Sequence, residues 1–432
     1  MPGRSFRAFA LALFIGAALV AAPAASARVG PCVPGSKKPV CHISQAKVGP
    51  VHDGDTFRAR IGKSRRLQLV RMTGVQAMEL HRYGRRAGRL GECNAVEATI
   101  ALERLIRRKR VRLVSQRRNA ITVGERGRLR RAVYVKKGGR WIDPAVELLR
   151  KGLALWFPNG QEWAWNRKYS VLAAKAARQG VGLWNPTSCA SGPNQESPLS
   201  MKVRWDADGT DSKNINGEWA RITNHDPVNA VPLHRWWFRD SHLRPRVTFG
   251  RSAVIPPGGS IRVLVGRGRD TADTFHWGLN EGVWENVVGG ARAMGDGGYL
   301  FDPQGDLRAY VQYPCRIGCT DPASGRVSIR ATYRGTEFIT VRNTSARPLD
   351  LTGYEISNVP WFYELFPATV LAPGQQLVLF IERGPALDGA LVRNWGFRKG
   401  ILADKADVVT LRNPVGAPVA CHKWGRAKCP RV

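Results

Sequence analysis

Two acidic positions close together, followed by a segment that ends in a glutamate, stand out in a strongly basic chain. Asp53 and Asp55 flank a glycine, and about twenty residues later Arg71 is followed by Glu79. Carboxylate oxygens are hard ligands, which Ca²⁺ and Mg²⁺ prefer. Carboxylates set among so many cations can hold a divalent metal against a phosphate. The residue types therefore indicate phosphodiester chemistry as the first hypothesis.

Hydrolysis of a phosphodiester needs a metal, a base that orients water, and cations for the charge that develops on the phosphate. Asp55 suits the metal and Glu79 suits the water. Arg71 and Arg128 suit the phosphate, because a guanidinium can bind it through two hydrogen bonds. Alternatives remain open: Asp55 could be only a turn residue, Glu79 a surface carboxylate near Arg82, and Arg128 part of a solvated basic face.

Three further positions near these residues have two interpretations each. Asp53 is expected to shape its turn by accepting backbone amide bonds rather than to bind a metal directly. Trp156 and Phe157 could stack on nucleic-acid bases, or they could pack in a core, which we favour.

The first half of the chain is expected to hold short strands followed by a few helices, which suits a small barrel packed on helices. In the first helix we expect Val96, Ile100, Leu102, Leu105 and Ile106 to form the apolar stripe. The strands are expected at Lys47–His52, Phe57–Ile61, Arg65–Met72, Val111–Ser115 and Ala132–Val135, and the helices at Cys93–Arg108, Pro144–Lys151 (capped by Asp143) and Trp163–Arg178.

The positive charge is concentrated in this half. The formal net charge is +34, and residues 28–190 carry 35 Lys and Arg against 10 Asp and Glu. A basic module attracts polyanions by phosphate contacts and counterion release. Charge alone thus favours DNA or RNA as the partner over mere solubility or attraction to an anionic cell surface.

Five fragments, in this order and spacing, resemble the thermonuclease family, the staphylococcal-nuclease-like domains, over about Lys47 to Trp184. The resemblance implies an oligonucleotide-binding barrel with helices that cleaves DNA and RNA with Ca²⁺, with Mg²⁺ or Mn²⁺ as alternatives. It assigns the metal to Asp55, the water-orienting base to Glu79, and the transition-state arginines to Arg71 and Arg128. The fragments are Asp53–Thr56, Arg71 with Gly74–Glu79, Gly127-Arg128, Glu147–Ala154 and Gly182–Trp184.

The chain departs from the family pattern at three positions. Gln76 stands where the family has an Asp that binds the metal, Met78 stands for Pro, and Arg126 stands for Tyr. An amide oxygen can coordinate Ca²⁺ but brings no charge, and the Ala77 carbonyl could contribute as well. We expect Gln76 and Ala77 to be metal ligands and Arg126 to contact the nucleic acid. Two outcomes stay open: an enzyme with altered metal preference, or an inactive barrel that still binds nucleic acid or another polyanion.

The second half is β-rich and repeats itself. The offsets between the copies are 119, 116 and 118 residues, which indicates two tandem domains. Its aspartates are expected to serve turns rather than calcium. The repeated segments are Glu218–Asn224 with Glu337–Asn343, Val254–Gly258 with Val370–Gly374, and Trp277-Gly278 with Trp395-Gly396.

Each copy resembles a lamin-tail domain, an immunoglobulin-like sandwich. The second copy adds a turn at Leu351–Tyr354, whereas the first copy reads Leu233–Trp237 there and departs from the pattern. The resemblance implies a binding or tethering module, so a cell-wall or surface ligand is the expected partner of residues 196–432. We find no catalytic constellation in this half.

The start of the chain predicts export. Arg4 and Arg7 precede the apolar run Ala8–Ala22, and Ala25–Ala27 is a small-residue cleavage site. The run is short for a bilayer span, and no later stretch is long and apolar enough, so no transmembrane segment is expected in the mature chain. The expected location is secreted or extracellular, with association to the cell surface left open.

The cysteines and the change in composition along the chain predict its disulfides and its domains. Eight cysteines in an exported chain favour disulfides over a zinc site at Cys421, His422 and Cys429. The expected fold is a multidomain chain, with an α+β oligonucleotide-binding-type barrel followed by two all-β sandwiches. The expected pairs are Cys32–Cys41, Cys93–Cys189, Cys315–Cys319 and Cys421–Cys429, and the expected domains are 1–27 (signal peptide), 28–46 (N-terminal segment), 47–190 (thermonuclease-like), 196–321 and 325–432 (lamin-tail-like).

Overall fold

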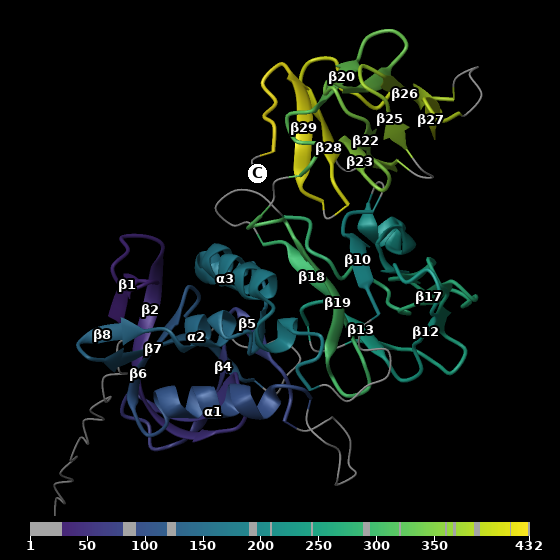
Figure 1. Cartoon of the computed structure of the whole chain (residues 1–432). Helices are drawn as coiled ribbons and strands as arrows, with labels where there is room; N and C mark the ends of the chain where they lie inside the picture. The colour runs from purple at the N-terminus through teal and green to yellow at the C-terminus, as the bar shows by residue number, and fades with distance from the viewer. Residues whose placement is uncertain are drawn as a thin grey trace, which may run out of the picture.

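The chain forms a helix-flanked barrel and two β-sandwiches (Figure 1). The predicted leader, Arg82, Arg126 and Cys319 lie outside the residues that the structure describes. The structure, a computed structural model, describes residues 28–80, 92–118, 127–189, 197–207, 210–242, 245–287, 294–318, 321–358, 361–365, 369–383, 389–414 and 416–430.

Five strands close the barrel in the order β2-β3-β4-β7-β6, because β6 also pairs with β2. β4 and β7 run parallel, and the other neighbours are antiparallel. The predicted domain boundary at residue 47 falls inside β2, so the segment 28–46 is part of the barrel sheet. The strands are β1 (Arg28–Pro31), β2 (Val40–Val51), β3 (Thr56–Ile61), β4 (Gln68–Met72), β5 (Val75–Ala77), β6 (Arg110–Ser115), β7 (Leu129–Lys137), β8 (Arg140–Ile142) and β9 (Ala154–Trp156).

The predicted helices are confirmed with shifted ends, as α1 (Ala95–Ile106), α2 (Pro144–Arg150) and α3 (Asn166–Gln179), with short 3₁₀ turns at Trp163–Trp165 and Gly182–Trp184. Asp143 caps α2 as predicted, since it accepts a bond from the Ala145 amide. The predicted apolar stripe of α1 is partly wrong: Val96 and Ile100 are exposed. The buried face instead uses the small residues Ala95 and Ala98 with Leu102 and Ile106, because α1 lies close to the barrel.

The two sandwiches share one topology, which confirms the internal repeat. Each pairs a four-stranded sheet, closed by one parallel pair, with an antiparallel four-stranded sheet and a small two-stranded ribbon. The first copy has β10 (Leu199–Arg204), β11 (Trp219–Asn224), β12 (Val231–Pro232), β13 (Trp237–Arg239), β14 (Val247–Thr248), β15 (Val254–Ile255), β16 (Ser260–Leu264), β17 (Thr274–His276), β18 (Asp296–Phe301) and β19 (Leu307–Tyr313), with 3₁₀ turns at Asp211–Lys213 and Ile215–Gly217. The second copy has β20 (Val327–Thr332), β21 (Phe338–Asn343), β22 (Leu349–Asp350), β23 (Glu355–Asn358), β24 (Trp361–Glu364), β25 (Val370–Leu371), β26 (Gln376–Glu382), β27 (Val392–Phe397), β28 (Asp407–Arg412) and β29 (Pro418–Trp424).

The repeated glutamate and asparagine make equivalent hydrogen bonds to backbone groups in both copies. Glu218 accepts bonds from the backbone amides of residues 283 and 284, and Glu337 accepts them from residues 401 and 402. Asn224 and Asn343 each donate to two backbone carbonyls. Buried polar side chains that satisfy loop backbone in this way explain why the sequence repeats there.

The first sandwich packs against the barrel and shares its hydrophobic core. Trp237, Tyr299, Phe301 and Leu307 belong to the same hydrophobic cluster as the barrel core. Asp306 Oδ1 accepts the Cys189 amide at 2.8 Å, beside the disulfide that joins Cys189 to Cys93. In Figure 1, β18 and β19 accordingly lie beside α3.

Three predicted disulfides are present: Cys32–Cys41, Cys93–Cys189 and Cys421–Cys429. The last bond removes the alternative of a zinc site at these cysteines. Cys315 is also disulfide-bonded. Among the described residues, no helix has both the length and the apolar character needed to cross a membrane.

Candidate active site

The turn between β2 and β3 places Asp55 under the barrel rim. Asp53 Oδ1 accepts the Asp55 amide at 3.0 Å, which confirms the predicted turn role of Asp53. Asp55 is 2% exposed, so it is no ordinary surface turn residue. Gly54 is required at this point, because a Cβ there would lie 2.6 Å from the Ala98 Cβ and 2.7 Å from that of Ala77.

A continuous polar network joins five of the predicted site residues. Arg71 Nη1 lies 2.5 Å from Asp55 Oδ2, and Arg71 Nη2 donates to Gln76 Oε1 at 2.6 Å. Gln76 Nε2 donates to the Ala77 carbonyl at 2.9 Å and to Glu79 Oε1 at 3.4 Å. The Ala77 amide returns to Asp55 Oδ2 at 2.7 Å. Asp55 and Glu79 therefore lie on the same side of the barrel, with Arg71 directed at Asp55.

Short local elements hold this network. Gly74 turns the chain from β4 to β5 with a φ of 79°, and a side chain there would strike the Tyr169 ring at 2.5 Å. β5 then pairs with β9, which fixes Gln76 and Ala77. The Glu79 amide donates to the buried carboxylate of Glu92 at 2.9 Å. The backbone on both sides of Gln76 is thus set by packing, and its side chain is held by three polar atoms, of Arg71, Ala77 and Glu79.

The surroundings of Asp55 shift the pKa of its carboxyl. Burial raises the pKa of the Asp55 carboxyl well above its usual range, and the nearby Asp53 and Glu79 charges add to the rise. The Arg71 guanidinium and the Ala77 amide oppose it. A second cation beside Asp55 would favour its ionised form in the same way.

A row of arginines extends from the network along β7. Arg130 is the register partner of Arg71 across the parallel β4–β7 pair, and Arg128 lies just before the start of β7. Burial lowers the pKa of Arg130 to about 10, with Arg71 and Arg128 contributing in the same direction and Glu162 opposing. Arg71 and Arg128 are therefore both close enough to Arg130 to repel its charge.

The three residues predicted to contact nucleic acid have different outcomes. Trp156 is 1% exposed and belongs to the barrel core, so core packing, the favoured interpretation, is confirmed and its candidacy for base stacking is wrong: its ring offers no free face to a base. Phe157 is 8% exposed, so it is buried too and the interpretation as a packing residue is favoured; the Arg130 guanidinium lies 5.3 Å from its ring centroid. Arg126 is outside the described residues.

Several residues at this site could not be predicted from the sequence. Arg130 belongs to no motif in the sequence, although the register with Arg71 assigns it to the network. Glu162 accepts the amides of residues 116 and 117 and acts electrostatically on Arg130 and Arg131. Arg131 is 8% exposed, so it does not belong to a solvated face. Only strand register and long-range packing reveal these roles.

Comparison with known proteins gives two matches. The family model described as the Lamin Tail Domain matches residues 320–426. A curated protein of Uncinocarpus reesii (strain UAMH 1704), "Probable endonuclease LCL3", is 29% identical over 196 residues, which are 39% of this chain and 61% of that protein. The chain thus spans about three fifths of the length of this relative. At a coarse level, the chain is similar to a protein that is named as an endonuclease.

Proposed function

We propose that this chain is a metal-dependent nuclease that hydrolyses phosphodiester bonds, with DNA as its first substrate and RNA as the second to be tested. The observation that carries the proposal is the unbroken network from Asp55 through Arg71 and Gln76 to Glu79, beside the arginine row of β7. The similarity to a protein named as an endonuclease supports the same reaction class.

Each residue of the site has a separate role in the proposed reaction. Arg71 and Arg128 bind the non-bridging oxygens of the phosphate and neutralise the charge that develops there. Glu79 Oε1 orients the attacking water and accepts its proton. Arg130 draws the polyanion to the site. The network holds these groups before substrate arrives, so little reorganisation is left for the reaction.

The donors fit a hard divalent cation, with Ca²⁺ proposed first and Mg²⁺ or Mn²⁺ as alternatives. The Ala77 carbonyl and Glu79 Oε1 converge on one donor, Gln76 Nε2, so an amide N–H₂ group stands between two oxygens as a cation would. Rotation of that amide would turn its oxygen toward the same place. Asp55, Gln76 and Ala77 are the residues that would hold the ion. Such an ion polarises the phosphoryl group when bound.

The test is a cleavage assay with purified protein. End-labelled single-stranded DNA, plasmid DNA and RNA are incubated separately with Ca²⁺, Mg²⁺, Mn²⁺ or EDTA. The proposal expects product with at least one metal and none with EDTA. Folded protein that forms no product under any metal would refute it.

A second candidate function is a non-catalytic binder of extracellular nucleic acid or another polyanion. The observation that favours it is the neutral Gln76 side chain, whose amide satisfies both Arg71 and the Ala77 carbonyl without an ion. This candidate expects metal-independent binding that weakens steeply with salt, without product. Formation of product only in the presence of metal would eliminate it.

We further propose that the chain is exported and that the second sandwich binds or tethers at a surface. The predicted leader motivates the first part, and the disulfides fit an oxidising compartment. The lamin-tail match motivates the second part. Fractionation of cells that express the full chain, followed by immunoblotting of medium and envelope, tests both.

A further inference from the structure

The end of β13 in the first sandwich contacts the rim of the barrel site. Arg239, the last residue of β13, donates to Met78 Sδ at 3.6 Å and to the His242 carbonyl at 3.1 Å. The His242 ring meets Phe157 edge to face, with 4.7 Å between ring centroids. Residues about 160 positions downstream of the network thus form part of its wall.

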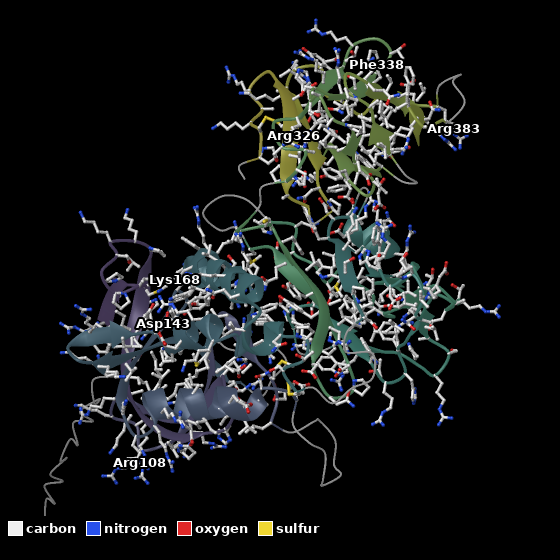
Figure 2. All side chains as sticks on the ribbon, in the orientation of Figure 1. Arg108, Asp143, Lys168, Arg326, Phe338 and Arg383 are labelled. Atoms are coloured by element: carbon white, nitrogen blue, oxygen red, sulfur yellow. A yellow bond between two sulfur atoms is a disulfide. The ribbon has the colours of Figure 1, made fainter. Side chains whose placement is uncertain are left out.

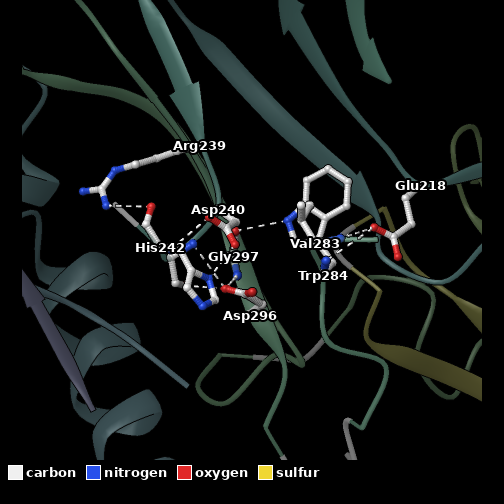
Figure 3. Close-up of polar contacts among 9 residues, drawn as sticks. Glu218, Arg239, Asp240, His242, Val283, Trp284, Asp296 and Gly297 are labelled. Carbon is white, nitrogen blue, oxygen red and sulfur yellow. Dashed lines mark hydrogen bonds and ion pairs between the residues drawn. The ribbon is translucent and has the colours of Figure 1, made fainter. Parts of the chain in front are cut away.

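His242 is held in a fixed orientation. Asp240 Oδ2 lies 2.7 Å from His242 Nδ1, and Asp240 Oδ1 accepts the His242 amide at 2.9 Å (Figure 3). Asp240 is 3% exposed, whereas the His242 side chain is 50% exposed. A carboxylate at Nδ1 fixes the proton on that nitrogen and directs Nε2 outward. Among the described residues, Nε2 has no partner.

Phe157 connects this histidine to the arginine row. Its ring is flanked by Arg130 and His242. Arg130 in turn pairs in register with Arg71. From the centre of the network outward, the order is Arg71, Arg130, Phe157 and His242. Arg71 and Phe157 are buried, whereas the His242 side chain is half exposed, so His242 is the group of this series that a ligand in solvent can reach.

The charges around His242 favour its cationic form. Burial lowers its pKa, but the Asp240 carboxylate more than offsets this, and Asp296 adds to the rise while Arg130 opposes it; the net pKa is above the ordinary value. Burial raises the pKa of Asp296 to about 7, with Asp240 contributing. Arg239 donates to the His242 carbonyl.

A metal ion is a poorer occupant for this cluster than a phosphate. Asp240, His242 and Asp296 lie close enough to hold an ion. Both oxygens of Asp240 are already engaged by His242, however, and Asp296 Oδ1 accepts bonds from Ser241 and Gly297. An ion would have to break these bonds, whereas an acceptor at Nε2 breaks none.

We propose that His242 binds a phosphate of the nucleic acid next to the cleaved one, through Nε2, so that the first sandwich completes the binding cleft of the barrel. This inference rests on the nucleic-acid binding in the proposed function. Asp240 acts as a positioning residue, because both of its carboxylate oxygens are engaged by His242.

The test measures binding without turnover. Fluorescence anisotropy of a labelled 12-nucleotide single-stranded DNA is followed in EDTA across a salt series, at pH 6.0 and pH 8.5. His242→Gln is expected to weaken binding about 5- to 10-fold at pH 6.0 and to reduce the slope of log affinity against log salt by about 0.7, the value for one lost contact on a single strand. At pH 8.5 the effect should be much smaller, and His242→Lys should keep the slope at both pH values.

The matched control is His276→Gln. His276 is also paired with an aspartate, Asp270, but it lies on β17, away from the barrel (Figure 1). It should leave affinity and slope unchanged. An unchanged slope for His242→Gln at pH 6.0, or a loss that His242→Lys does not restore, would overturn the inference.

Failure of this inference differs from failure of the nuclease proposal. A wild-type protein that cleaves DNA with metal while His242→Gln keeps the full salt slope would leave the nuclease standing and remove His242. A wild-type protein that never cleaves, but loses the slope in His242→Gln, would do the reverse.

Discussion

At the scale of single residues, Gln76 decides how the site works. Its amide oxygen accepts from Arg71, and its amide nitrogen donates to the Ala77 carbonyl and Glu79. Each contact neutralises a group that a cation or a phosphate would otherwise bind. The replacement of the family's Asp by Gln76 therefore has a structural consequence. The polar groups of the site already hydrogen-bond to one another, and an ion must displace the Gln76 amide to bind.

Replacing Gln76 by Asp should strengthen the binding of Ca²⁺. The change removes the two N–H donors, adds a carboxylate, and leaves the Ala77 carbonyl and Glu79 in need of a cation. Calorimetric titration with Ca²⁺ should show at least about a tenfold gain in affinity, since an added carboxylate charge is the main determinant of calcium affinity. Gln76→Asn, which stays neutral, is the control. Equal Ca²⁺ affinity in wild type and Gln76→Asp would mean that the ion sits elsewhere.

How much of the site the sequence could predict follows from where its residues lie. Asp55, Arg71, Gln76, Ala77 and Glu79 are within one short segment, and motif spacing brought them together correctly. Arg130 required the β4–β7 register, and His242 required the docking of a distant sandwich. Neither relation leaves a local pattern in the chain, so residue types alone gave no signal for them.

At the scale of elements, helix α2 depends on one buried carboxylate. Asp143 accepts the Ala145 amide at 3.1 Å and the Tyr169 hydroxyl at 2.9 Å, which ties the start of α2 to α3. Burial raises its pKa to about 6, although Lys168 nearby opposes the rise (Figure 2). The cap was predictable from sequence, because Asp before Pro is a helix-start signal. Its tie to α3 was not.

Asp143→Ala should lower the free energy of opening of α2 by about 2–3 kcal/mol, since it removes a cap and leaves the Tyr169 hydroxyl without its partner. Asp143→Asn should cost about 1 kcal/mol or less, because it keeps a capping oxygen. Amide hydrogen exchange of α2 at pH 4, where Asp143 is protonated, measures both costs. Similar costs for the two variants would contradict the capping role.

The same residue predicts a pH dependence. The folded pKa of about 6 lies above the ordinary 3.8, so the folded chain binds the proton more tightly than the unfolded chain. Stability from this group is therefore full below about pH 4 and is lost as the pH rises through 6. Relative to Asp143→Asn, wild-type α2 should lose up to about 3 kcal/mol between pH 4 and pH 7. Parallel pH profiles for the two proteins would rule this out.

At the scale of the whole molecule, the three domains form a connected series. Aromatic residues of the first sandwich pack in the barrel core. Phe362 of the second sandwich packs in the core of the first sandwich. Lys202 lies 3.0 Å from Glu355 and 2.9 Å from Glu364, and Arg221 also pairs with Glu364. Composition and repeats predicted the number of domains and their β character. They could not predict the fusion, because an interface has no periodicity of its own.

Removing one charge from the interface between the sandwiches should loosen it. Glu364→Gln leaves Lys202 and Arg221 buried with less compensation, which is costly in a low-dielectric setting. Hydrogen exchange in β10 and β24 should rise at least about tenfold, while the barrel strands stay unchanged. Glu382→Gln, at the exposed end of β26, is the control. Unchanged exchange in both strands would show that apolar packing alone holds the two copies together.

The measurement that tests the central claim most directly is single-turnover cleavage of single-stranded DNA by wild type and Glu79→Gln, with Ca²⁺ and with EDTA. The two proteins are purified identically, so the variant also reports any contaminating nuclease. We predict a rate at least about 100-fold lower for Glu79→Gln, since it removes a general base, with DNA affinity within about twofold of wild type. Wild-type cleavage that persists in EDTA, or a Glu79→Gln rate equal to that of wild type, would contradict the account.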